Sequence, residues 1–141
     1  EFQTPHYERM IVMFGQKVLT QDHWNTEEAL AGMKPEVYQP PQPELIWQRD
    51  GVCCERVVNF LDFDAFRLSI PAGKRIRLEG KGNYQLLMGV EGYGQLLVGG
   101  ESCGTIRHEE GWMIPAVTYD CWLESRGTGD LICLQAIPKS S

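Results

Sequence analysis

The sequence predicts an all-β fold, a sandwich or barrel of short strands that follows an N-terminal extension. From Leu45 onward, apolar stretches alternate with turn residues, at the spacing of about 8–12 residues that is typical of small β-sandwiches and barrels. Thirteen of the fifteen glycines lie after residue 50, where tight corners and bulges need them. Helix start and stop signals occur in one short segment, before the predicted strands.

Residues 1–43 are predicted to form the extension. Asn25 or Thr26 can cap a helix of one or two turns, and Gly32 can end it. Residues 35–43 carry four of the eight prolines, so this connector cannot join the middle of a sheet.

Residues 44–141 are predicted to form the barrel. Asp50-Gly51 is a strong hairpin signal between two apolar stretches. In the next strand, residues 63–70, alternation places one set of side chains on the inner face. These predicted inner residues are Phe66, Leu68 and Ile70.

Two later segments carry specific expectations. The run YQLLMGV, residues 84–90, is almost entirely apolar, which predicts a strand covered on both faces. The segment EEGWMIPA, residues 109–116, predicts a strand that ends at Pro115, because proline fixes φ and lacks an N–H group. The sequence predicts that bulky side chains fill the barrel, among them Trp112, Trp122, Met88 and Leu86.

Composition excludes some classes of partner. The net charge of −6 and the pI of about 5.0 argue against nucleic acid, which needs a surplus of basic residues. No apolar stretch approaches the ~20 residues of a membrane span, and the first residues do not resemble a signal peptide. The five cysteines include no C-x-x-C pair, which favours reduced, packed thiols in a cytoplasmic protein.

The order of these signals resembles the cupin family. VEGYGQLLV, residues 90–98, is similar to the end of the first cupin motif, where a Glu-Gly turn separates two strands. EEGWMIPA is similar to the second motif, where a glycine opens a strand that ends in proline. The resemblance implies a double-stranded β-helix, or jelly roll.

A narrower resemblance is to the C-terminal part of type I mannose-6-phosphate isomerases. It rests on the order of EFQTPHYER, HWNTEEAL and VVNFLDFDAFRLSI. It implies that the chain is the C-terminal cupin of such an enzyme, joined to the tail of a preceding catalytic cupin. The parent would interconvert mannose 6-phosphate and fructose 6-phosphate with zinc, and this chain alone would be inactive.

The resemblance also assigns candidate catalytic residues. The isomerisation arginine of the family falls on Arg9, and a basic residue on the phosphate side falls near Lys17, with a two-residue shift in spacing. Thr4-Pro5-His6 stands where the family has a Ser-Asp segment. The zinc ligands of the family, a Gln-x-His pair, a Glu and a later His, would all precede this chain.

A metal site within this chain is not expected. Zinc needs three or four N, S or O ligands, yet residues 73–98 contain no histidine and none follows Pro115. Glu91 suits a turn, and His108 suits the surface. No cofactor is therefore predicted here, and zinc belongs to the suspected parent.

Two other functions compete with the structural one. A non-catalytic cupin could bind a sugar, including a sugar phosphate, or a protein partner, and Trp24, Tyr38 and Trp47 lie in segments predicted to be exposed. Residues 7–19 are too apolar to be left in water. They predict contact with the barrel, a preceding catalytic domain or a second copy of the chain.

Overall fold

The computed structural model describes residues 26–33 and 39–139, and the chain divides into two units, residues 1–40 and 41–141. In the first unit, α1 spans Thr26–Ala31. Gly32 follows directly, and the Met33 N–H donates to the Leu30 carbonyl at 3.2 Å. The predicted short helix and its end are thus confirmed. No helix among the described residues has the length and apolar character needed to cross a bilayer.

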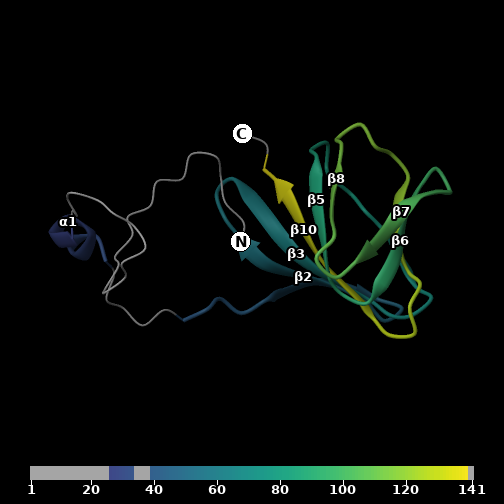
Figure 1. The fold of residues 1–141 in the computed structure, drawn as a ribbon, viewed down its shortest axis with the longest axis horizontal. Helices are drawn as coiled ribbons and strands as arrows, with labels where there is room; N and C mark the ends of the chain where they lie inside the picture. The colour runs from purple at the N-terminus through teal and green to yellow at the C-terminus, as the bar shows by residue number, and fades with distance from the viewer. Residues whose placement is uncertain (1–25, 34–38, 140–141) are drawn as a thin grey trace, which may run out of the picture. The chain divides into compact units, whose positions relative to one another are not determined.

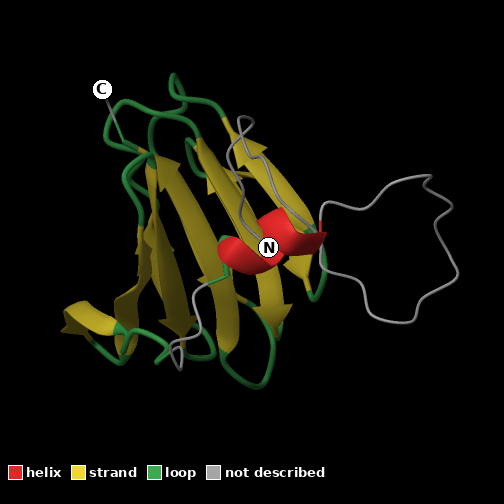
Figure 2. Cartoon of the chain, turned by 90° about the vertical axis from the view of Figure 1, so that its left-hand side faces the viewer, coloured by secondary structure: helices red, strands yellow, loops and turns green. Residues whose placement is uncertain are grey.

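The second unit is built from antiparallel strands arranged in two sheets (Figures 1 and 2). The six-stranded sheet has the order β1-β2-β3-β10-β5-β8, and the four-stranded sheet has the order β4-β9-β6-β7. The strands are β1 (Glu44–Arg49), β2 (Val52–Asn59), β3 (Phe63–Ile70), β4 (Arg75–Arg77), β5 (Gln85–Glu91), β6 (Tyr93–Val98), β7 (Glu101–Arg107), β8 (Gly111–Ile114), β9 (Cys121–Ser125) and β10 (Leu131–Pro138). This is the jelly roll that the sequence predicts.

The hairpin between β1 and β2 forms where the sequence predicts it. Asp50 and Gly51 have φ values of 52° and 83°, the left-handed pair that a two-residue turn needs. Arg49 and Val52 are partners on either side of the turn. β1 is an edge strand whose residues are all exposed, which confirms the surface position of Trp47.

The core lies between the two sheets and is apolar. Phe66, Leu68 and Ile70 are 8%, 1% and 0% exposed, so the inner face predicted for β3 is confirmed. From the opposite sheet, Leu96 and Leu123 are equally buried. Because side chains alternate between the two faces of each strand, the inward-facing side chains of the two sheets meet and form an aliphatic core.

Two predictions about the barrel filling are wrong. β5 is covered on one face only: Leu87 is 2% exposed, whereas Leu86 and Met88 are 42% and 37% exposed on the outer face. Trp122 also lies outside the core, where Arg75 stacks over its ring at 4.7 Å. Of the four residues predicted to fill the barrel, only Trp112 packs against the core.

The reason for the error is the composition of β5. A mainly apolar run does not reveal which of its alternate positions face outward. In β5 the more apolar set, Leu86, Met88 and Val90, is exposed, whereas the polar Gln85 is buried. β8 ends at Ile114, directly before Pro115, so the predicted role of that corner in ending a strand is confirmed.

Candidate functional site

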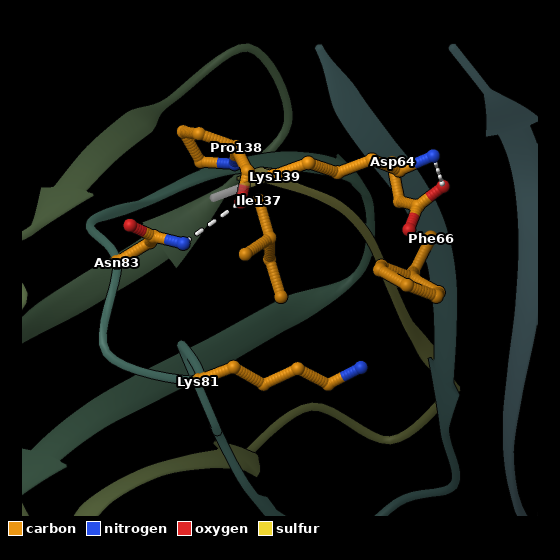
Figure 3. Close-up of a pocket in the computed structure, with 7 residues that line it drawn as sticks. All are labelled: Asp64, Phe66, Lys81, Asn83, Ile137, Pro138 and Lys139. Carbon is orange, nitrogen blue, oxygen red and sulfur yellow. Dashed lines mark hydrogen bonds and ion pairs between the residues drawn. The ribbon is translucent and has the colours of Figure 1, made fainter. Parts of the chain in front are cut away.

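A pocket of about 210 Å³ opens at one end of the barrel (Figure 3). The start of β3, the end of β10 and the turn before β5 form it. Asp64 and Ile137 are register partners on these two strands, so both lie at the same level of the sheet. The pocket is lined by Asp64, Phe66, Lys81, Asn83, Ile137, Pro138 and Lys139.

Two cationic side chains lie beside Asp64 on one side of this pocket. Lys139 Nζ lies 3.1 Å from Asp64 Oδ1, and Arg56 Nη1 lies 3.9 Å from the same oxygen. Oδ1 is buried and accepts no hydrogen bond of good geometry within the described part of the chain. The contact with Lys139 is therefore a charge attraction without an aligned hydrogen bond.

Lys139 is itself fixed by other acceptors. Its Nζ donates to Asn59 Oδ1 at 2.7 Å and to the Phe60 carbonyl at 2.6 Å. Arg56 in turn donates its Nε to Glu44 Oε2 at 3.1 Å. Both cations that face Asp64 are thus committed to other partners as well, which fixes their positions beside the carboxylate.

Lys81 enters the pocket from a tight turn. Lys81 and Gly82 have φ values of 51° and 84°, and the Asn83 N–H donates to the Gly80 carbonyl at 2.8 Å, as in a type I′ turn. Asn83 Nδ2 donates to the Pro138 carbonyl at 3.0 Å. This bond ties the turn to the end of β10.

Two neutral amides lie in the barrel interior, on strands next to the pocket. Gln85 and Gln135 are 3% and 6% exposed, and Gln135 Nε2 donates to Gln85 Oε1 at 2.5 Å. Each amide therefore satisfies part of the hydrogen-bonding need of the other, as buried polar groups require.

Zinc does not fit the described interior. No group of three or more His, Cys, Asp or Glu side chains gathers anywhere in residues 26–33 and 39–139. Burial raises the pKa of the Cys54 thiol to about 11 and that of Cys133 to about 12, so both remain protonated at neutral pH and are poor metal ligands. The inner amides are neutral and weak donors to a metal.

The sequence-predicted site residues have different outcomes. Arg9 and Lys17 lie outside the described residues, as do Trp24 and Tyr38. His108 is exposed, as predicted, and its Nδ1 lies 2.7 Å from the Val90 carbonyl oxygen.

Sequence reasoning missed three pocket residues, Asp64, Lys81 and Lys139. The sequence predicts the strand that carries Asp64, but not its pairing with the strand that ends before Lys139. The sequence GKGN, residues 80–83, could have predicted the turn that carries Lys81. Glycine at the second central position of a two-residue turn favours the left-handed conformation.

The chain has the fold of the cupins, a double-stranded β-helix barrel. A search of solved structures finds an RmlC-like cupin from Shewanella frigidimarina, at 14% identity and a TM-score of 0.57, covering 70% of this chain and 86% of that one. A sugar phosphate isomerase of the cupin superfamily from Silicibacter pomeroyi is similar at 13% identity and a TM-score of 0.56, covering 64% and 61%.

A third similar structure is the mannose 6-phosphate isomerase from Bacillus subtilis, at 15% identity and a TM-score of 0.63. That match covers 82% of this chain but 34% of the isomerase, so the chain spans about a third of that enzyme's length. No protein-family model matches the sequence, and no curated protein matches it significantly.

Proposed function

We propose that this chain is the C-terminal cupin part of a mannose-6-phosphate isomerase-like protein, in which it has a structural role and binds no metal. Aldose–ketose isomerisation moves a proton between C1 and C2 of an opened sugar phosphate. A metal polarises the substrate oxygens, and cations stabilise the negative charge that develops. The described interior, with aliphatic side chains, protonated thiols and amides, suits support rather than that chemistry.

The length of the isomerase match carries this proposal. The barrel unit, residues 41–141, is 101 of the 141 residues, or 72% of the chain. The matches to the two other cupin structures cover 70% and 64% of this chain, a share that the barrel alone can supply. The match to the isomerase covers 82% of this chain. The isomerase match therefore covers a larger share of the chain than the barrel unit contains.

Arg9 and Lys17 are part of the proposal. Arg9 would stabilise the enediolate, and Lys17 would hold the phosphate group, once a preceding catalytic domain supplies the zinc site. Both roles come from the family resemblance alone.

Two measurements test the structural role. The isolated chain should show no isomerase activity toward mannose 6-phosphate and no stoichiometric zinc by mass spectrometry. The reading frame before Glu1 should encode a Gln-x-His pair and a later histidine strand. Activity or one equivalent of zinc in the 141-residue chain would contradict the proposal, as would a reading frame without those ligands.

A second candidate function is that of a non-catalytic cupin that binds a sugar or a protein partner. The observation that favours sugar binding is the polar pocket at the barrel mouth, where Lys81 and Asp64 lie over an apolar floor. Titration with sugars, followed by tryptophan fluorescence and NMR, tests it. No response to any neutral or phosphorylated sugar would remove this candidate.

A further inference from the structure

The pocket at the end of the barrel offers a ligand one positive and one negative group. Lys139 and Arg56 are engaged with Asn59, Phe60 and Glu44. Asp64 and Lys81 remain as the charged groups whose hydrogen-bonding capacity is open to a ligand. No carboxylate of the described residues pairs with the Lys81 ammonium group.

Asp64 can accept a hydrogen bond from a molecule in the pocket. Its side chain is 18% exposed although Oδ1 is buried, which leaves Oδ2 as the accessible oxygen. Figure 3 shows this second oxygen on the side of the pocket that holds Phe66, away from Lys139. The acceptor is thus held in place by Arg56, which does not line the pocket, and by Lys139, which lines it but donates its ammonium hydrogens to Asn59 and Phe60.

The floor of the pocket is apolar. Phe66 and Ile137 are 8% and 7% exposed and belong to the inner faces of adjacent strands. Figure 3 shows the Lys81 side chain extending below Ile137 toward the strand of Phe66. A ligand here would therefore contact hydrocarbon on one face and charged groups at its edge.

The backbone at Lys81 is held in a costly conformation. A non-glycine residue in the left-handed region is strained by its Cβ, and Lys81 has a φ of 51°. Strain of this kind persists where surrounding contacts impose it, as it also does in the turns at Asp50, Glu109 and Asp120. The Asn83–Pro138 hydrogen bond at 3.0 Å is one of the contacts that hold this turn.

We propose that this pocket binds a neutral polyol, such as the ring of a simple sugar, with adjacent hydroxyl groups between Lys81 and Asp64. This rests on the second candidate function above. A hydroxyl can accept a hydrogen bond from the ammonium while its neighbour donates to the carboxylate. The C–H face of the ring packs on Phe66 and Ile137. An anion can pair with Lys81 but is repelled by Asp64, and a cation can pair with Asp64 but is repelled by Lys81 and Lys139. Adjacent hydroxyl groups can use both Lys81 and Asp64 at once, which favours a neutral ligand.

Titration of the whole chain by NMR tests the site. Methyl α-D-mannoside and myo-inositol are the neutral probes, mannose 6-phosphate the anionic probe and ethanolamine the cationic probe. We expect shifts of the Ile137 methyl and the Asn83 side-chain amide with both neutral probes, with a dissociation constant on the order of 1 mM. Equal or tighter binding of either charged probe would overturn the proposal.

Variants separate binding from folding. Lys81→Asn removes the ammonium and relieves the left-handed strain, because asparagine tolerates that conformation. It should melt no lower than the wild type while binding falls about 10-fold or more. Asp64→Asn should weaken binding similarly. Lys74→Met and Asp62→Asn remove exposed charges outside the pocket and serve as matched controls.

The outcomes are distinguishable. Unchanged binding in Lys81→Asn would overturn this site. Sugar-induced shifts confined to residues outside the pocket would also overturn it, but would leave the second candidate function standing. No shift with any probe would remove this site and sugar binding as a candidate function, and would leave the structural role in an isomerase-like protein untouched.

Discussion

Gln135 donates its Nε2 hydrogen to Oε1 of Gln85 across 2.5 Å inside the barrel. Replacing Gln135 with leucine should leave the Gln85 amide without this partner and lower the free energy of unfolding by about 1–3 kcal/mol. The double variant Gln85→Leu/Gln135→Leu should recover most of that loss, because neither amide is then stranded. Urea denaturation of Gln85→Leu, Gln135→Leu and the double variant measures this coupling, and additive losses in the double variant would contradict it.

Neighbouring leucines on β5 should respond differently to truncation. Leu87 is 2% exposed and Leu86 is 42% exposed. Leu87→Ala should lower the free energy of unfolding by about 2–5 kcal/mol, because it leaves a cavity in the core. Leu86→Ala should cost under about 1 kcal/mol. Equal losses in chemical denaturation would show that β5 is covered on both faces.

Gly92 should tolerate a side chain less well than Gly73. Both have positive φ, 82° and 72°, so alanine costs roughly 1–2 kcal/mol at either position from the backbone alone. A Cβ on Gly92 would lie 2.3 Å from the Asp130 carbonyl oxygen, whereas nothing lies within 4 Å at Gly73. Gly92→Ala should therefore have the lower melting temperature. The opposite order would argue against this contact between the β5–β6 turn and the residues before β10.

The buried thiols predict a loss of stability at alkaline pH. Burial raises the pKa of Cys133 from 9.0 to about 12, so the unfolded chain releases this proton first. The resulting stabilisation is complete below pH 9 and is lost as the pH rises from 9 toward 12. The free energy of unfolding of Cys133→Ala should fall less steeply between pH 9 and 11 than that of the wild type. Cys103→Ala, at an exposed position, should follow the wild-type slope, and identical slopes in all three proteins would refute the assignment.

Much of the barrel is predictable because its signals are local. Alternation places Phe66, Leu68 and Ile70 inward, and Asp50-Gly51 forms its hairpin, since both depend on neighbouring residues alone. The outward direction of Leu86 and Met88 is not predictable, because their run is mainly apolar and the polar Gln85 takes an inward position.

The pocket depends on pairings that no local pattern contains. Asp64 meets Lys139 because β3 pairs with β10, strands separated by most of the barrel sequence. Lys81 joins them through a turn that Asn83 ties to Pro138. The residue types are visible in the sequence, but their proximity is a property of the sheet order.

Lys139 also connects the last described residues to the β2–β3 hairpin. Its backbone N–H donates to the Asp62 carbonyl at 2.8 Å, and its ammonium reaches Asn59 and Phe60. A single residue thus fastens the β2–β3 hairpin to the end of the final strand. Proteolytic removal of Lys139 would break the contacts that hold this hairpin to β10. It would also expose the Asp64 carboxylate, with Arg56 as its one remaining cationic neighbour among the described residues.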